Sequence, residues 1–465
     1  MQGALGVTEY GSVIIPSEVL GTKLLELDKT YAFGGKSYSS KAVEGIRTFA
    51  DTDDGIQYTV CVINITEDYY RRNYTVRGYI KYTDANGAQK VIYTNSYATN
   101  LYTVAKEALK DTTIGDSDRA YLTTIKNYVD ETLKQEYMNQ TRTDIKGSSA
   151  DPKTWIYQLG DGVMVREVEI DSGIPGSDVE IVQLSDTHFN YCTEEDLKDP
   201  VLASTWENRR AFRYPGTQTA LLNSIEYASY SDQIVVTGDA IDYLSQGCVD
   251  LLYTYVWNPY PDTLIPLGNH EPVKKMQGTV AETTTVAERY EQLKKVWKHD
   301  VYYTEKILKN DEGTEKVMIV TMDNSQRKFW DHQVPLLEAS IEKAKAKGLP
   351  ILLFTHIPFV TRNPADASMN AIRINDTTSS PANFYNDGSF ISDTGTGATK
   401  QIYDLIAMNP DVVKAHFCGH WHCDFYTEIW SKNADGTDNK DVVIPQYILT
   451  GSAYDKGHAL RITVK

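Results

Sequence analysis

Polar side chains capable of metal binding or acid–base chemistry follow five apolar runs in the second part of the chain. The runs are VEIVQLS, QIVVTG, TLIPLG, PILLFT and VVKAHFC. The polar residues that follow them are, in chain order, Asp186 and His188; Asp239; Asn269, His270 and Glu271; His356; and His420 and His422. Short apolar runs rich in branched residues are typical of buried strands. Because ligands gather at the carboxyl ends of strands in α/β sheets, we expect these side chains to converge at one edge.

The last of these stretches, HFCGHWHCDF at residues 416–425, also has a local interpretation. His420 and His422 lie between Cys418 and Cys423, which could form a small mixed Cys/His zinc site or simply a crowded strand end. A single histidine after a strand is more often structural than a ligand. Here, however, five of the nine histidines follow apolar runs together with aspartates and an asparagine. We therefore predict one shared metal centre and expect the cysteines to be buried as small apolar residues.

Composition limits the classes of protein that the chain can belong to. Its 465 residues suggest two or three domains, and a 41% hydrophobic content predicts packed cores. The formal net charge of −17 argues against a broad basic face, so we expect no long nucleic acid as partner. Five cysteines do not suggest a disulfide scaffold, and no apolar run is long enough for a transmembrane segment. The first 20 residues lack the basic head and apolar core of a signal peptide.

The first 105 or so residues have the composition of β structure. The stretches Tyr58–Thr66 and Tyr74–Thr94 are rich in Tyr, Val, Ile and Thr, and Asn86-Gly87 supplies a tight hairpin turn within the second. This region resembles a β module found on secreted and surface proteins of bacteria. The resemblance implies a secreted or cell-surface location, with attachment through the N-terminal domain. We predict an all-β, sandwich-like domain at 1–110, a helical connector at 111–152 and an α/β domain at 153–465.

The five polar blocks spell D-x-H, GD, GNHE, H and GHxH in that order. This pattern resembles the signature of the calcineurin-like metallophosphoesterases over about residues 155–465. The resemblance implies a four-layer αββα sandwich that holds two divalent or trivalent transition-metal ions, such as Fe, Mn or Zn. The implied ligands of the first ion are Asp186, His188, Asp239 and His422. Those of the second are Asp239, Asn269, His356 and His420, so that Asp239 would bridge the ions.

The same resemblance implies a metallophosphoesterase that hydrolyses phosphomonoesters or phosphodiesters through a metal-bridging hydroxide, with His270 as general acid. We expect the substrate to be a small phosphoester or a nucleotide. An alternative is a surface binding or adhesion protein whose metallophosphoesterase domain is catalytically silent. The complete set of motif residues argues against that alternative, because a silent domain is expected to lose some of them.

Several neighbouring residues give further expectations. Purple acid phosphatases carry a tyrosine ligand three residues after the GD aspartate, where this chain has Asp242, so we expect no tyrosinate ligand. Because Asp186 and His188 are two residues apart, an extended segment would aim both side chains the same way.

Arg209, Arg210 and Arg213 are candidates for contact with a substrate phosphate, although exposed arginines are usually only solvated. The long polar segment 361–399 is either a functional lid or disordered.

Overall fold

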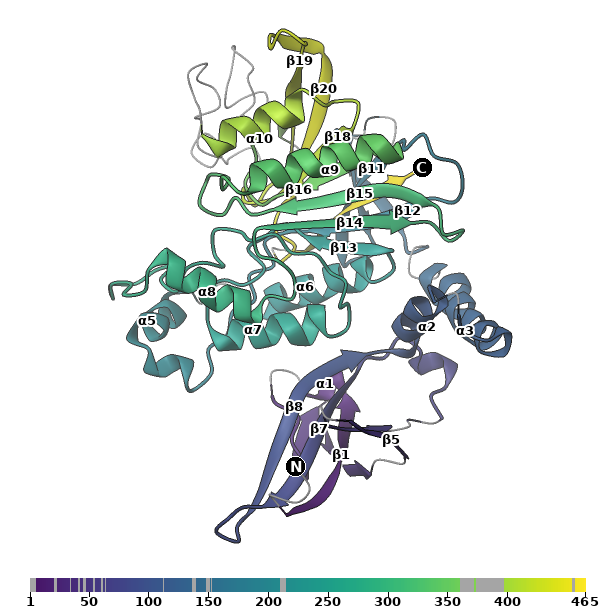
Figure 1. Ribbon diagram of the computed structural model, residues 1–465, viewed down its shortest axis with the longest axis vertical. Helices are drawn as coiled ribbons and strands as arrows, with labels where there is room; N and C mark the ends of the chain where they lie inside the picture. The colour runs from purple at the N-terminus through teal and green to yellow at the C-terminus, as the bar shows by residue number, and fades with distance from the viewer. Residues whose placement is uncertain are drawn as a thin grey trace. The chain divides into compact units, whose positions relative to one another are not determined.

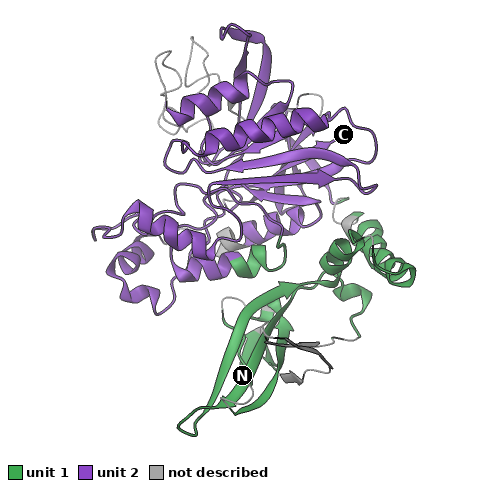
Figure 2. Cartoon of the chain, viewed as in Figure 1, with its two compact units in different colours: residues 1–139, 253–261 green, residues 140–252, 262–465 purple. Residues whose placement is uncertain are grey.

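The computed structural model describes the whole chain except residues 1–5, 21–22, 34, 41, 45–46, 53–54, 60–61, 63, 112, 136–138, 148–150, 152, 210–214, 360–371, 374–396 and 454–455. The chain forms two compact units, which are residues 1–139 with 253–261, and residues 140–252 with 262–465 (Figures 1 and 2). In the part of the chain that is described, no helix has the length and apolarity needed to cross a membrane. The domain boundaries given above stay a prediction.

The first unit is β-rich, as predicted. Its main sheet is antiparallel with strand order β4-β1-β7-β8, and two separate hairpins are formed by β2 with β3 and by β5 with β6. The strands are β1 (Val7–Pro16), β2 (Thr30–Phe33), β3 (Lys36–Ser39), β4 (Ala42–Glu44), β5 (Arg47–Thr52), β6 (Gly55–Thr59), β7 (Tyr74–Thr83) and β8 (Gln89–Thr99). The predicted hairpin turn is confirmed between β7 and β8, where Gly87 has a φ of 80°.

The first unit also contains helices, and only those within residues 1–110 depart from the all-β expectation, because residues 111–152 are the predicted helical connector. The helices are α1 (Ser17–Leu20), the 3₁₀ turn Glu67–Tyr69, α2 (Leu101–Leu109), α3 (Asp116–Tyr128), and the π-helical segments Val129–Lys134 and Tyr253–Trp257. Helix α2 lies within the region predicted to be all β. The side chain of Asn100 accepts a hydrogen bond from the backbone N–H of Thr103, a cap that stabilises the start of α2.

The second unit contains two sheets. The six-stranded sheet has the order β13-β12-β21-β11-β10-β9, and the seven-stranded sheet has the order β14-β15-β16-β18-β20-β19-β17. The strands of the first are β9 (Arg142–Lys146), β10 (Ile156–Leu159), β11 (Val163–Ile170), β12 (Val179–Leu184), β13 (Gln233–Val236) and β21 (Gly457–Val464). Those of the second are β14 (Tyr303–Lys309), β15 (Glu315–Met322), β16 (Ile351–Phe354), β17 (Ile372–Arg373), β18 (Val413–Cys418), β19 (Phe425–Lys432) and β20 (Asp438–Ile448). Strand β9, which lies within the predicted connector, is an edge strand of the six-stranded sheet.

The two sheets pack face to face and helices cover their outer faces, which gives the four-layer α/β sandwich expected (Figure 1). The helices of this unit are α5 (Pro200–Asn208), α6 (Pro215–Ala228), α7 (Gln246–Leu252), α8 (Val286–Val296), α9 (Gln333–Lys347) and α10 (Ala398–Ala407), with a 3₁₀ turn at Asp196–Lys198. Helix α6 packs on the six-stranded sheet, and α9 and α10 pack on the seven-stranded sheet.

Strand β15 shows why its sequence is almost continuously apolar. Val317 and Ile319 belong to the core between the two sheets, whereas Met318 and Val320 belong to the core under α9 and α10. Successive side chains of a strand point to opposite faces, so a strand buried on both faces needs apolar residues at every position.

One of the five apolar runs is not a strand, contrary to expectation. In TLIPLG, at residues 263–268, only Leu264 makes a bridge, to Val235 of β13. Pro266 has no N–H to donate, and proline is therefore rare inside a ladder. The other four runs form β12, β13, β16 and β18, in two parallel pairs. The carboxyl ends of these four strands therefore carry the polar loops described next.

Candidate metal centre

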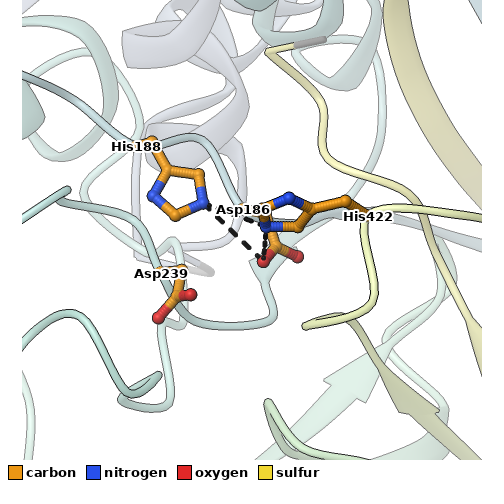
Figure 3. A group of neighbouring side chains, drawn as sticks. All are labelled: Asp186, His188, Asp239 and His422. Atoms are coloured by element: carbon orange, nitrogen blue, oxygen red, sulfur yellow. Dashed lines mark hydrogen bonds and ion pairs between the residues drawn. The ribbon is translucent and has the colours of Figure 1, made fainter. Parts of the chain in front are cut away.

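The first group of candidate ligands comes from loops after β12, β13 and β18, which belong to the two different sheets (Figure 3). Oδ1 of Asp186 lies 3.1 Å from Nε2 of His422 and 3.9 Å from Nε2 of His188. The two imidazole Nε2 atoms are 3.2 Å apart. Asp239 completes the group, in which the four potential ligand atoms all lie within 4.8 Å of one another.

The second group comprises Asp239, His356 and His420, with Asn269 beside them. Nε2 of His356 lies 3.2 Å from Oδ2 of Asp239 and 3.2 Å from Oδ1 of Asn269. Nδ1 of His420 lies 3.1 Å from the same Nε2 atom. The structure therefore brings together all seven residues predicted as ligands, in the two sets that the family resemblance implied, with Asp239 in both.

The donor atoms of these side chains are better satisfied by metal ions than by hydrogen bonds among themselves. Oδ1 of Asp186 is buried, and imidazole nitrogens of His422 and His188 face it at 3.1 and 3.9 Å. Burial of such a carboxylate oxygen is costly unless a cation compensates it. Carboxylate, amide and imidazole donors grouped in this way suit Fe, Mn or Zn ions.

The backbone at the site is held in an unusual conformation. Five of the seven candidate ligands have positive φ: Asp186 (49°), His188 (46°), Asp239 (48°), His420 (74°) and His422 (51°). The expectation that Asp186 and His188 lie on an extended segment is therefore wrong, because both residues have left-handed backbones. Such conformations are uncommon outside glycine and cluster at functional sites. Each tight loop turns a side chain towards the centre directly after its strand.

Two glycines allow these loops to approach closely. A Cβ on Gly268 would lie 2.2 Å from Oδ1 of Asp239, and a Cβ on Gly419 would lie 2.4 Å from Oδ2 of Asp186. Neither contact is sterically possible without movement of the loops. The glycines of the GNHE and GHxH blocks are thus needed for space around the two carboxylates.

His188 of the first group and His356 of the second group each face the candidate ligands with Nε2. Their other ring nitrogen, Nδ1, contacts a different kind of partner in each case. Nδ1 of His356 donates to the backbone carbonyl of Thr237, at 2.7 Å. Nδ1 of His188 instead lies 3.2 Å from the carboxylate of Asp242. Both contacts turn Nε2 towards the candidate ligands, and metal-binding histidines commonly have such partners.

Asp242 is a component of the site that the sequence analysis did not predict. Its Oδ1 also lies 3.1 Å from Nδ1 of His270, and Arg209 and Asn190 donate to the carboxylate as well. Burial would raise the pKa of Asp242, but hydrogen bonds from His188, His270 and Arg209 outweigh it and hold the pKa well below its usual value. The only sequence signal for this role is its position three residues after Asp239.

His270 lies at the edge of the centre, between Asp239 and Asp242. Its Nδ1 donates to the backbone carbonyl of Asp242 at 2.8 Å, and its Nε2 lies 3.7 Å from Oδ2 of Asp239. Burial would lower the pKa of His270, but the two carboxylates outweigh it and raise the pKa to about 9. The side chain keeps 10% of its surface exposed. His270 is therefore held at Nδ1, while Nε2 faces the centre.

The electrostatics of the facing pair His356 and His420 are unequal. Burial lowers the pKa of both, but the carboxylates of Asp239 and Asp186 reverse this for His356 and raise its pKa to about 10. For His420, burial and the nearby His356 lower the pKa to about 3. Without an ion, His420 is thus uncharged at neutral pH, whereas His356 is a cation that must lose its Nε2 proton to bind a metal ion.

Glu271 of the GNHE block ties two loops together. Its buried carboxylate accepts hydrogen bonds from the backbone N–H groups of Asp239, Ile241 and Gly268, at 3.1, 3.1 and 2.6 Å. Burial, together with the charge of Asp239, raises its pKa to about 7. Glu271 therefore orients the loop that carries Asp239 instead of facing the centre itself.

The remaining candidates from the sequence have mixed outcomes. The four described cysteines, Cys192, Cys248, Cys418 and Cys423, are all buried, as predicted, and none belongs to a ligand group. Arg209 is not a solvated surface residue, because its guanidinium binds Asp242, and its contact with substrate stays a prediction. The expectations for Arg210 and Arg213, and nearly all of the segment 361–399, lie outside the described residues.

Comparison with known proteins identifies the family of the chain. The family model for calcineurin-like phosphoesterases matches residues 179–424, a range that contains all seven candidate ligands and His270. The chain belongs to the calcineurin-like phosphoesterase family. No curated protein matches the chain.

Three similar solved structures are phosphatases or a hydrolase. A dimetal phosphatase from Danio rerio is 11% identical, with 59% of this chain and 87% of that chain covered and a TM-score of 0.32. The phosphopantetheinyl hydrolase of Mycobacterium tuberculosis is 15% identical, with 60% and 91% covered and a TM-score of 0.30. The purple acid phosphatase PPD1 of yellow lupin is 9% identical, with 98% and 59% covered and a TM-score of 0.33. At these scores the family assignment rests on the family model.

Proposed function

We propose that the second unit hydrolyses small phosphoesters, either monoesters or diesters, at a centre for two transition-metal ions. The observation that carries this proposal is the pair of ligand groups that share Asp239. When bound, two such ions polarise the phosphoryl group and lower the pKa of a water molecule. Six of the seven candidate ligands follow strands, and five of these six have strained left-handed backbones, so the chain is organised to hold the ions before substrate arrives.

His270 is the residue that we propose as general acid. Its Nδ1 proton is shared between the backbone carbonyl and the carboxylate of Asp242, which leaves Nε2 as the atom that can deliver a proton to the leaving oxygen. Nε2 lies 3.7 Å from Oδ2 of Asp239, the residue shared by both ligand groups, so it is close to the place where the phosphoryl group would bind. A positioned acid of this kind contributes typically about 10²–10⁴-fold to the rate.

The substrate class is also part of the proposal. A net charge of −17 does not favour long polyanions, which supports small phosphoesters or nucleotides. The secreted or cell-surface location, with attachment through the N-terminal unit, remains a proposal supported by the resemblance of the first 105 or so residues to bacterial surface modules.

The test measures the hydrolysis of several phosphoesters by protein samples that are each reconstituted with a different metal. The chain is loaded with Mn, Fe, Zn, Co or Ni, metal content is measured, and turnover of p-nitrophenyl phosphate and bis-p-nitrophenyl phosphate is followed. We expect two ions per chain and turnover of at least one substrate, and the ratio of the two rates separates monoesterase from diesterase activity. Full loading with no turnover of either substrate would contradict the proposal and favour a binding protein with a silent domain.

A further inference from the structure

Arg209 makes a buried, two-point contact with Asp242. Its Nε donates to Oδ2 of Asp242 at 2.8 Å, and its second terminal nitrogen donates to Oδ1. The side chain of Arg209 is 14% exposed and that of Asp242 is fully buried. The planar guanidinium fork matches a carboxylate at both oxygens, which gives such a pair more directional strength than a surface ion pair has.

The backbone of Arg209 is fixed as well. Its N–H donates to the carbonyl of Thr205 at the end of α5, at 2.9 Å, and its carbonyl accepts from Nδ2 of Asn190, also at 2.9 Å. The same Nδ2 atom donates to Oδ2 of Asp242 at 2.7 Å. Asn190, Arg209 and Asp242 therefore form a closed hydrogen-bonded ring, which anchors the end of α5 to the loop after β13.

The Asp242 carboxylate in turn contacts two histidines of the site. Oδ1 lies 3.2 Å from Nδ1 of His188, a candidate ligand, and 3.1 Å from Nδ1 of His270, the proposed acid. A carboxylate free to rotate about its last bond could not hold both rings in place. Arg209, which binds both oxygens, prevents that rotation.

We propose that Arg209 is a positioning residue, which fixes the Asp242 carboxylate and through it the rings of His188 and His270. The proposal rests on the function proposed above for this centre. It changes the role expected for Arg209 from a substrate contact to a brace behind the site. Lysine cannot replace it fully, because an ammonium group cannot match both carboxylate oxygens in one plane.

The first test is a double-mutant cycle in kcat with R209Q, D242N and the double variant. We expect R209Q to lower kcat for an alkyl phosphate by about 10–100-fold with KM changed less than about twofold, as for other residues that support metal ligands. If Arg209 acts through Asp242, R209Q in the D242N background causes no further loss. R209K should recover part of the loss. A raised KM with unchanged kcat, or fully additive losses, would overturn the proposal.

The second test does not depend on activity. Mn²⁺ titration by calorimetry should show that R209Q weakens one of the two binding steps by about tenfold and leaves the other unchanged. R461Q is the matched control, because Arg461 pairs with Glu180 elsewhere in the same unit, and we expect wild-type binding. Equal Mn²⁺ binding in R209Q and the wild type contradicts the positioning role. An inactive wild-type protein in which R209Q still weakens one step would instead contradict only the proposed function.

Discussion

The two ligand groups of the centre are built differently around their central histidines. His356, in the second group, is held by the backbone carbonyl of Thr237, directly after a core strand. His188, in the first group, is held by the side chain of Asp242, which depends on Arg209 at the end of α5. A contact with a backbone carbonyl persists as long as the fold does, whereas a contact with a side chain can be removed by a single substitution. We therefore expect single substitutions to alter the first group more readily than the second.

The largest effect is expected where the two groups meet. Asp239 is the only residue common to both, so D239A removes a donor from each. We expect loss of both ions and a fall in kcat/KM by about 10⁴-fold or more, because the ions supply several kcal/mol of transition-state stabilisation. Metal analysis and kinetics check this. Retention of one ion at full occupancy would show that Asp239 does not bridge the groups.

The next effect separates proton transfer from metal holding. H270A should keep both ions but lower turnover of alkyl phosphates by about 10³-fold, with a much smaller loss for p-nitrophenyl phosphate, whose leaving group needs little protonation. His270 belongs to neither ligand set, which is why the ions should stay. Equal losses for both substrates, or unchanged rates on alkyl phosphates, would rule out His270 as the acid.

A third substitution changes the partner of the histidine in one group only. D242N removes the charge behind His188 and leaves the Thr237 carbonyl behind His356 untouched. We expect about 10–100-fold weaker binding at one site only, measured by competition with a metal-responsive dye. Because Arg209 then lacks its counter-charge, the melting temperature must be measured and the titration done well below it. Equal weakening of both sites would mean that Asp242 does not act on the first group alone.

The smallest effect concerns the space around the carboxylates. G419A places a Cβ against Asp186 of the first group, and G268A places one against the shared Asp239. We expect each to lower the free energy of unfolding by about 1–3 kcal/mol, as overpacking does. G268A should weaken both metal sites and G419A mainly one. G397A, where a Cβ would meet no atom within 4 Å, is the control and should cost less than about 1 kcal/mol.

Much of the centre could be predicted because its ligands follow readable signals. Asp186, His356 and His420 each follow a run of apolar residues that forms a buried strand. Buried parallel strands need apolar residues on both faces, so the point at which polarity returns marks the strand end. The pattern therefore located the ligands without any knowledge of their distances.

What could not be predicted depends on contacts that have no sequence spacing. Asp242 and Arg209 are 33 residues apart and meet only because α5 returns to the loop after β13. The left-handed backbones of Asp186 and His188 were also missed, because an alternate spacing suggests an extended segment. Helix α2 was included in a β region, since its start depends on one cap at Asn100.

The most direct test of the proposed two-ion centre is an anomalous-diffraction measurement on crystals of the Mn²⁺-loaded chain. We expect two anomalous peaks about 3.5–4 Å apart, with Asp239 in contact with both. Asp186, His188 and His422 should surround one peak, and Asn269, His356 and His420 the other. A single peak, or a peak bound by Cys418 or Cys423, would contradict it.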